Sequence, residues 1–444
     1  MNSTFSIIEY QAFSKEDLKE IFKEKAEGFY KELEDFAKNN ENLLGFKNKN
    51  TLKAKNYVGI IQTKSGVLEI LPKCTNLDSY KKEDSSSNHD KEKLRRCYKL
   101  DNISKNNDFY EKDFKFNPKN LLINMLKTLK NSPFKKSQIS SLQSSKIPLF
   151  EVFITMFLDE FDSVYKKGLM RSYLSCEENR AFLKGKLLFN EHIKQNLIHK
   201  ERFFTSSDEF VLDIAPNRLI KSTLNFLKSK TSLNKFRLIK AMQMFDEVKF
   251  SKNYEKDFSY KISRHFDYYE NLLLWCKIFL KNESFMPYHG KNEAFALLFP
   301  MEKIFEDYVA HMLKKVNPTQ NIKTQSSEKY LISKKGKKCF MLKPDLYIEN
   351  ETILDTKWKI PDSNEDKKHG IAQSDLYQMF AYACKFKIHD IKLIYPLCER
   401  TMNLQNTIKE LEFNANEHLA FLNDNNSPLK TNIKVQVFFA PLPF

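Results

Sequence analysis

The 444-residue sequence contains little glycine and no paired cysteines. Nine glycines leave few positions for loops that cradle phosphate, and no G-x-x-x-x-G-K-[ST] segment occurs, so we do not expect a nucleotide-hydrolysing motor in this chain. The seven cysteines are scattered, without a C-x-x-C pair or zinc-ligand spacing. An odd number in a long chain argues against a disulfide framework and favours a reducing compartment.

Long apolar runs are also absent. No run approaches the ~20 residues that a membrane-spanning helix needs. The first residues lack a basic stretch followed by an apolar one, so we expect no signal peptide. These two absences predict a cytoplasmic protein.

The charge balance is strongly positive, with 73 Lys and Arg against 57 Asp and Glu, a formal net charge of +16. This excess favours a polyanionic partner, nucleic acid first and an acidic membrane surface second, although a lysine-rich proteome would explain it equally well. The sequence is 41% hydrophobic and 13% aromatic, so it can bury substantial cores. Its length indicates two or three domains.

The first two thirds of the sequence predict two segments. Residues 1–145 are expected to form an α+β module, with a helix over 14–38 that begins at the N-cap Ser14 and two strands at 57–62 and 67–71. A polar stretch at about 75–117 is expected to be a mobile loop or insertion. Residues 146–285 then predict a helical middle domain, including an amphipathic helix from Leu149 that ends near Gly168.

In the last segment, 286–444, the sequence pattern predicts strands interspersed with helices. A helix is predicted from Met301, because apolar residues recur there every three or four positions. The remaining expected elements are strands at 329–333, 339–349 and 352–359, a helix at 371–386, and strands at 391–395 and 433–439. The order of helix, three strands, helix and strand indicates an α/β layer, and the whole chain is expected to be a multi-domain α/β protein.

Charged residues interrupt two of these strands. Asp355 and Lys357 are two apart in Ile353–Lys359, so both side chains share one face, whereas Thr356 faces the other way. A tight turn at 349–351 would bring Asp345 beside Asp355. Two adjacent carboxylates repel one another, and Mg²⁺ would relieve this while activating water for phosphodiester cleavage. The alternative is a surface hairpin in which Asp355 and Lys357 merely form an ion pair.

These residues resemble the PD-(D/E)xK nuclease motif, whose fold has the same order of core elements. Gln378 and Tyr382, four apart on one helical face, are similar to the trailing Q-x-x-x-Y motif of RecB-like nucleases, in which these residues line the active site. The resemblance implies that Asp345 and Asp355 bind metal, that Lys357 assists the attack, and that Gln378 and Tyr382 support the site.

Acids on the neighbouring helices are further candidates. The helix before the strands carries Glu302 and Glu306, and the family pattern favours Glu306 as a third metal ligand, although a solvated glutamate is an equal alternative. Asp375 shares a helical face with Gln378 and could orient a lysine, while an acid at a helix start explains it as well. Lys359 could contact phosphate or simply be solvated.

A narrower resemblance is to the McrC family. It is carried by ILDTKWK followed by QSDLYQMFAYA, with looser agreement at 66–73 and 299–309. It implies a Mg²⁺-dependent DNA endonuclease subunit of a 5-methylcytosine restriction system. Such a subunit acts on methylated double-stranded DNA with a McrB-like AAA+ GTPase hexamer, on which its N-terminal part docks and whose hydrolysis it stimulates. The alternatives are a stand-alone repair or defence nuclease, and a non-catalytic DNA-binding adaptor or GTPase activator.

Overall fold

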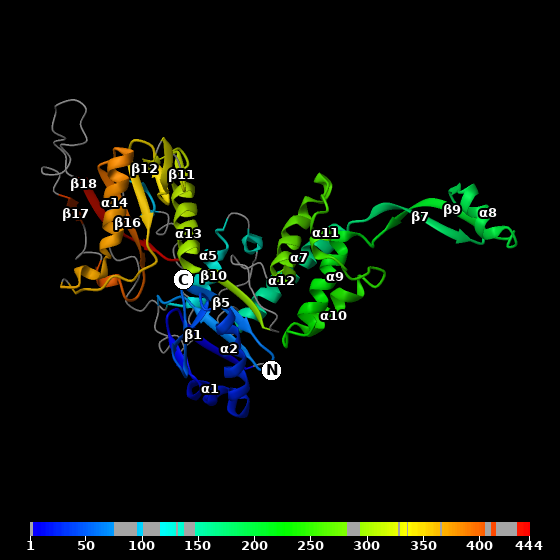
Figure 1. Ribbon diagram of the computed structural model, residues 1–444, viewed down its shortest axis with the longest axis horizontal. Helices are drawn as coiled ribbons and strands as arrows, with labels where there is room; N and C mark the ends of the chain where they lie inside the picture. Colours follow the sequence, from blue (N-terminus) through cyan, green and yellow to red (C-terminus); the bar gives the residue numbers. More distant parts are fainter. Residues whose placement is uncertain are drawn as a thin grey trace. The chain divides into compact units, whose positions relative to one another are not determined.

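The computed structural model describes most of the chain in two compact units (Figure 1), one comprising Phe150–Glu283 and the other comprising Asn2–Leu149 with Ser284–Phe444. Much of the polar segment expected at 75–117 lies outside the described residues. No helix in the described part of the chain is long and apolar enough to cross a membrane. The structure describes residues 3–74, 96–100, 116–129, 132–136, 147–281, 294–326, 329–334, 336–364, 366–404, 410–413 and 433–444.

The predicted middle segment, 146–285, corresponds to the first unit. The first and last predicted segments, 1–145 and 286–444, contribute to the other unit together. They are joined because β10 (Phe295–Pro300) pairs antiparallel with β5 (Tyr57–Gln62). A division of the chain into three separate domains therefore remains a prediction.

The N-terminal part of this unit contains a four-stranded sheet of order β1-β6-β5-β10. β1 (Thr4–Ile8) is parallel to β6 (Val67–Leu71), and β5 is antiparallel to both of its neighbours. The expected hairpin of β5 and β6 is confirmed, and its turn is closed by the N–H of Thr63, which donates to the carbonyl of Gly66 at 2.9 Å. Both strands are buried along their whole length, which explains their mostly apolar sequences.

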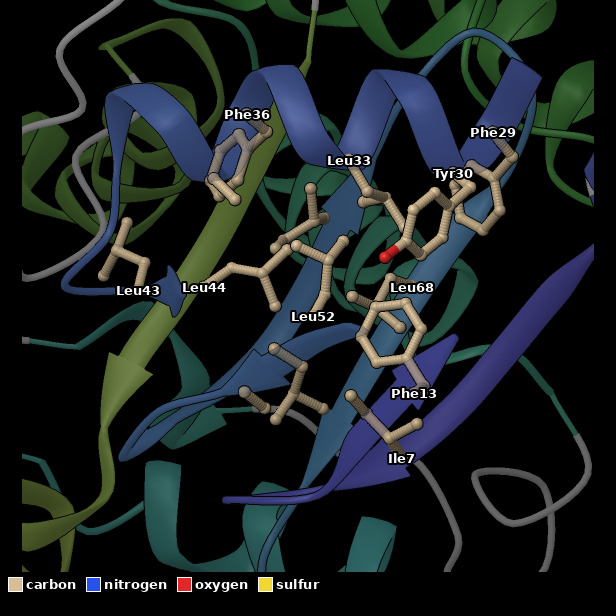
Figure 2. Close-up of a cluster of buried hydrophobic side chains, with 14 of the residues drawn as sticks. Ile7, Phe13, Phe29, Tyr30, Leu33, Phe36, Leu43, Leu44, Leu52 and Leu68 are labelled. Atoms are coloured by element: carbon tan, nitrogen blue, oxygen red, sulfur yellow. The ribbon is translucent and has the colours of Figure 1, made fainter. Parts of the chain in front are cut away.

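Helix α2 (Ala26–Asn39) packs on this part of the unit through one apolar face. Its buried residues Phe29, Leu33 and Phe36 recur at helical spacing and are fully shielded from solvent. Figure 2 shows them pointing from the helix towards apolar side chains of the strands. Those labelled side chains are Ile7, Phe13, Leu43, Leu44, Leu52 and Leu68.

The single helix predicted over 14–38 is interrupted. The N-terminus is confirmed, because the N–H of Ser14 donates to the Asp17 carboxylate at 2.7 Å. The chain then breaks at Lys23, whose φ of +50° lies in the left-handed region, and a short 3-10 turn separates α1 from α2. A three-stranded sheet of order β2-β4-β3 completes the region. The bounds are β2 Ala12–Ser14, α1 Lys15–Phe22, η1 Lys23–Lys25, β3 Leu44–Asn48 and β4 Thr51–Ala54.

The last segment forms a six-stranded sheet of order β11-β14-β15-β16-β18-β17. β14 is antiparallel to β11 and β15, whereas β15, β16 and β18 run parallel and β17 is antiparallel to β18. Helix α13 packs against β15, and α14 packs against β16 and β18. β15 is therefore an interior strand. The bounds are α13 Met301–Val316, β11 Ile322–Thr324, β14 Leu346–Ile348, β15 Thr352–Thr356, α14 Gln373–Phe386, β16 Asp390–Leu397, β17 Glu410–Phe413 and β18 Ile433–Pro441.

Two strand predictions for this segment were wrong in detail. The strand expected at 339–349 is broken between Leu342 and Leu346, because Pro344 has no N–H to donate to a strand ladder. The strand expected at 329–333 pairs outside the main sheet, forming a separate two-stranded sheet of β12 (Lys329–Lys334) and β13 (Lys337–Leu342). β11, with only three residues, was not predicted.

The unit at 150–283 contains a sheet besides its helices, although the sequence predicted a helical domain. The helix expected from Leu149 is confirmed, but a three-stranded sheet of order β7-β9-β8 follows it. In Figure 1, β7 and β9 lead away from the helices of this unit, and α8 lies at their far end. Most of β7 is at least partly exposed, so it lacks the apolar alternation that would have predicted a strand. The bounds are α7 Leu149–Lys167, β7 Ser172–Arg180, β8 Lys186–Leu187, α8 Phe189–Asn196, β9 Phe203–Val211, α9 Ala215–Lys228, α10 Lys235–Gln243, α11 Tyr254–Phe258, η4 Arg264–Tyr269 and α12 Glu270–Lys281.

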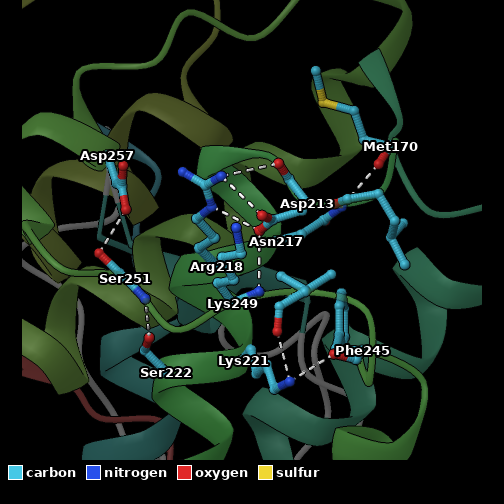
Figure 3. Close-up of polar contacts among 12 residues, drawn as sticks. Met170, Asp213, Asn217, Arg218, Lys221, Ser222, Phe245, Lys249, Ser251 and Asp257 are labelled. Carbon is cyan, nitrogen blue, oxygen red and sulfur yellow. Dashed lines mark hydrogen bonds and ion pairs between the residues drawn. The ribbon is translucent and has the colours of Figure 1, made fainter. Parts of the chain in front are cut away.

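Polar contacts fix the start of α9 in this unit (Figure 3). The side-chain amide of Asn217 donates to the carbonyls of Met170 and Leu212, both at 2.8 Å. The guanidinium of Arg218 pairs with the Asp213 carboxylate at 2.7 Å. These side chains satisfy buried backbone groups, so they act structurally.

Candidate active site

The hairpin of β14 and β15 brings the two predicted acids together. Leu346 pairs with Leu354 and Ile348 with Thr352, so the same register continued by one residue sets Asp345 opposite Asp355. The turn between the strands is closed by the N–H of Glu351, which donates to the carbonyl of Ile348 at 3.1 Å. This is the arrangement that the sequence predicted.

Asp355 is a buried carboxylate in an interior strand, with only 1% of its surface exposed. Burial and the charge of Asp345 raise the pKa of Asp355 to about 7. Lys357 forms an ion pair with Asp355. Burial disfavours the charge of Lys357, but the adjacent Asp355 carboxylate more than offsets this, and the pKa of the amine is raised. A surface hairpin with a solvated ion pair is therefore excluded.

The faces of β15 alternate as predicted. The amine of Lys357 donates to the side-chain carbonyl of Gln378 on α14 at 3.0 Å. Trp358, the next residue, instead contacts Phe305 of α13, with ring centroids 5.2 Å apart. The charged pair thus lies on the side of the strand covered by α14.

Asp345 is held at the end of β15 by Thr356, a residue that the sequence did not single out. Both the N–H and the hydroxyl of Thr356 donate to Oδ2 of Asp345, at 2.8 and 2.6 Å. The carbonyl of Asp345 accepts from the N–H of Gln325 at 3.0 Å. Both hydrogen bonds end on Oδ2, and within the described residues none ends on Oδ1 of Asp345. The small hydroxyl in the D-T-K triplet was the available signal.

Gln378 and Tyr382 form one hydrogen-bonded chain with the lysine. The amide nitrogen of Gln378 donates to the Tyr382 hydroxyl at 2.7 Å, and this hydroxyl donates to the carbonyl of Lys343 at 3.0 Å. The chain fixes the orientation of the amide, so its oxygen faces the amine of Lys357. Burial and the charge of Asp355 raise the pKa of Tyr382, which keeps the hydroxyl a donor.

Of the two candidate glutamates on α13, Glu306 is the one that faces the acids. It is 9% exposed, and burial together with the charge of Asp345 raises its pKa. Oε1 of Glu306 accepts from Lys303 at 2.8 Å and from Gln325 at 2.9 Å. Glu302 is exposed and acts instead on Glu9, whose pKa is raised mainly by burial and to a smaller extent by the charge of Glu302. The metal-binding role of Glu306 remains a prediction.

Asp375 and Lys359 extend the charged surroundings. The amine of Lys359 pairs with the carboxylate of Asp375 at 2.7 Å, and Asp375 is only 6% exposed. The charge of Asp375 also raises the pKa values of Asp355 and Lys357. Asp375 therefore belongs to the site's electrostatics and does more than cap a helix.

The residues present suit a hard divalent cation. A buried carboxyl whose pKa lies near 7, with a second acid beside it, is the donor chemistry that Mg²⁺ stabilises. Among the described residues, no group of three or more His, Cys, Asp and Glu side chains is arranged to hold a metal. The protein ligands would accordingly be few, with water and substrate oxygens completing the shell, which is the usual manner of Mg²⁺ binding.

Two residues of the N-terminal segment, Glu9 and Lys73, form hydrogen bonds with Trp358, just after the strand that carries the site. The indole N–H of Trp358 donates to Oε2 of Glu9 at 2.9 Å, and the amine of Lys73 donates to the carbonyl of Trp358 at 2.8 Å. Glu9 is buried, and this burial raises its pKa to about 7. The conformation of the chain directly after Lys357 therefore depends on residues near the N-terminus.

The fold and site define a class: a mixed α/β, multi-domain protein with paired carboxylates and a lysine at the end of an interior strand. A family model described as the McrBC 5-methylcytosine restriction system component matches residues 52–396. The chain belongs to this family, as its resemblance to McrC proteins led us to expect. No curated protein matches the sequence.

One solved structure supports the fold. The chain is similar to one in the refined half-complex from a tetradecameric assembly of Thermococcus gammatolerans McrB AAA+ hexamers with bound McrC. The two share 19% identity with a TM-score of 0.62, and the match covers 99% of this chain and 94% of that one. A chain of the T. gammatolerans McrBC complex gives 19% identity and a TM-score of 0.45, over 70% of this chain and 87% of that one.

Proposed function

We propose that this protein is the Mg²⁺-dependent endonuclease subunit of its restriction system, with a C-terminal core of the PD-(D/E)xK class. The observation that carries the proposal is the buried pair of Asp355 and Lys357 beside Asp345. A buried ion pair contributes little to stability, and strongly shifted pKa values concentrate at functional sites. Family membership supports the choice of DNA as the substrate.

In this proposal the acids hold the cation and the lysine serves the substrate. Asp345 and Asp355 would hold Mg²⁺ directly and Glu306 would act through a bound water, and the chemistry of the cation there is to activate water and to shield charge on the scissile phosphate. The amine of Lys357 orients the attacking water or stabilises the charge that develops on the phosphate. Gln378, fixed by Tyr382, keeps this amine in place.

We also propose that the chain acts with a McrB-like AAA+ GTPase hexamer and stimulates its hydrolysis. The related structure contains McrB hexamers with bound McrC, which supports such a partner. The sequence has no phosphate-binding loop of its own, so nucleotide hydrolysis falls to the partner. The N-terminal segment is proposed to dock on the ring, and recognition of 5-methylcytosine is assigned to the partner.

The test compares Asp355→Asn with Asp390→Asn. Both remove one carboxylate from the same sheet, but Asp390 pairs with Thr352 at the opposite end of β15. Each variant is mixed with the cognate GTPase, GTP, Mg²⁺ and methylated plasmid. Asp355→Asn is expected to lower the cleavage rate by at least about 100-fold, in the range found when a group that stabilises the transition state is removed. Asp390→Asn is expected to cleave normally.

The GTPase rate, measured in the same mixtures, separates the alternatives. Both variants should still stimulate hydrolysis, because the partner surface is intact. Cleavage that survives Asp355→Asn would refute the site. Cleavage by the wild-type chain without any GTPase would favour a stand-alone nuclease, and GTPase stimulation without any cleavage would favour a non-catalytic activator.

A further inference from the structure

A positively charged hairpin leads directly into the candidate active site. It comprises residues 329–342, which include β12 and β13, and we call it the basic hairpin. Its sequence contains five lysines and no Asp or Glu. Lys343 follows immediately and Asp345 stands two residues later. The lysine-rich segment thus directly precedes Asp345, a proposed metal ligand, in the chain.

The basic hairpin is exposed along most of its length. Its lysines at 329, 334, 337 and 338 are exposed, and within the described residues none of them is paired with a carboxylate. Large apolar side chains are exposed with them, which is unusual for strands facing only water. The exposed fractions are 40% for Leu331, 49% for Ile332, 70% for Phe340 and 41% for Met341.

The base of the hairpin, where β13 ends, is fixed beside α14, the helix that carries Gln378 and Tyr382. The carbonyl of Lys343 accepts the hydrogen bond from the Tyr382 hydroxyl, and Leu342 packs against the core cluster that includes Met379. β12 also lies against α14, as Figure 1 shows. A ligand held by the hairpin would therefore lie close to Gln378 and Tyr382.

Phe340 is set apart from the strand ladder. Its φ of +57° lies in the left-handed region, which an aromatic residue rarely adopts. The pairing of β12 with β13 is interrupted there, between the pairs Tyr330–Met341 and Ile332–Cys339. Strain of this kind at an exposed aromatic side chain is typical of a position used for binding.

We propose that the basic hairpin is a DNA-binding element that positions the duplex over the active site. Lys337 and Lys338, beside the turn, contact backbone phosphates, and Phe340 makes apolar contact with the groove wall. The charge pattern selects this occupant, because a surface whose charged residues are all lysines attracts a polyanion and repels a second copy of itself. The inference rests on the proposed function, since it assumes that DNA is the substrate.

The experiment measures binding of the full chain to a fluorescent 30-base-pair duplex in EDTA, so cleavage plays no part. Lys337→Ala/Lys338→Ala is compared with Lys47→Ala/Lys49→Ala, which removes two exposed lysines from the β3–β4 hairpin. The first pair should lower affinity about 10-fold at 0.1 M salt and reduce the slope of log affinity against log salt by about 2. The control pair should change neither. Phe340→Ala should weaken binding at every salt concentration with an unchanged slope.

Each result decides a different point. Equal affinity losses for the two lysine pairs, or no loss for Lys337→Ala/Lys338→Ala while the wild type binds, would overturn the hairpin proposal alone. A wild-type chain that fails to bind the duplex would overturn both this inference and the proposed function. Circular dichroism melting curves establish that the variants are folded. Sedimentation velocity completes the test, because a dimer dissociated by Phe340→Ala with unchanged DNA affinity would identify the surface as a self-interface.

Discussion

At the scale of single residues, the site depends on small groups that hold the charged ones. The sequence identified Asp345, Asp355, Lys357, Gln378 and Tyr382 because motif spacing predicts which side chains share a face. It missed Thr356, although the hydroxyl in the D-T-K triplet offered a signal, and it could not identify Gln325, whose role comes from a loop that meets the strand end in space. The structure brings all seven into one neighbourhood, and the metal and catalytic roles remain to be tested.

Thr356 offers a test of this support. Its hydroxyl donates to Oδ2 of Asp345, so Thr356→Val, which conserves shape, should leave the carboxylate less well oriented. Loss of such an outer contact typically lowers metal affinity about 10-fold. Mn²⁺ titration calorimetry measures this. The matched control is Thr352→Val on the same strand, whose hydroxyl donates to the carbonyl of Asp390. Unchanged Mn²⁺ affinity in Thr356→Val would contradict the assigned role.

Glu9 makes stability depend on pH. Its pKa is raised from 4.5 to about 7 by burial, and its Oε1 has no hydrogen-bond partner among the residues that the structure describes. The folded protein therefore keeps a proton that the unfolded chain releases, so stability falls as pH rises from about 4.5 to 7. The free energy of unfolding therefore falls by on the order of 3 kcal/mol over this range, because each unit by which the pKa is raised corresponds to about 1.4 kcal/mol.

Glu9→Gln removes this titration while its side-chain carbonyl can still accept from Trp358. We expect urea unfolding of this variant to lose less stability between pH 5 and pH 8 than the wild type does. Glu20→Gln, an exposed position on α1, controls for the change in net charge. Identical pH dependence in wild type and Glu9→Gln would show that the carboxyl is ionised throughout.

At the scale of elements, the sequence predicted those that carry strong periodicity or clear end signals. The helices from Met301 and Leu149 and the hairpin at 57–71 were confirmed because apolar spacing, a Pro or a Gly-containing turn defines each. The strand at 339–349 was wrong because apolar residues continue across Pro344, although the ladder cannot. β7 and β9 were missed since neither strand has a continuous buried face that apolar alternation would reveal.

Replacing two glycines of one unit by alanine is expected to change stability in opposite directions. Gly59 of β5 has a φ of +135°, and a Cβ there would lie 2.0 Å from the carbonyl oxygen of Leu297 on β10. Gly59→Ala should therefore destabilise the protein by at least about 2 kcal/mol, through both overpacking and strain. At Gly28 of α2, a Cβ would meet only Oγ of Ser65 at 3.7 Å, so Gly28→Ala should stabilise by about 0.5 kcal/mol. Urea unfolding of the two variants checks both signs, and a neutral Gly59→Ala would contradict the β5–β10 packing.

At the scale of the whole molecule, the two units differ in how continuous they are in sequence. The unit at 150–283 closes its polar network internally. The hydroxyl of Tyr269 donates to the side-chain carbonyl of Asn217, and the Glu151 carboxylate accepts from Thr231 and Ser232. The other unit is discontinuous in sequence, because β10 pairs with β5 and the indole of Trp358 donates to Glu9. This arrangement could not be predicted from the sequence, since strand partners far apart in the chain leave no local signal.

This difference predicts how fragments behave. A fragment of residues 149–281 should unfold cooperatively on heating, because Tyr269, Asn217 and Glu151 keep the hydrogen-bond partners named above. A fragment of residues 294–444 should show no cooperative transition, since it would expose the paired edge of β10 and leave the Trp358 indole N–H without Glu9. Adding residues 1–74 in trans offers β5, Glu9 and Lys73 again, and should restore a transition. Unfolding is followed by circular dichroism. A cooperative transition of 294–444 alone would contradict this prediction, because it would show that the C-terminal core folds without the N-terminal strands.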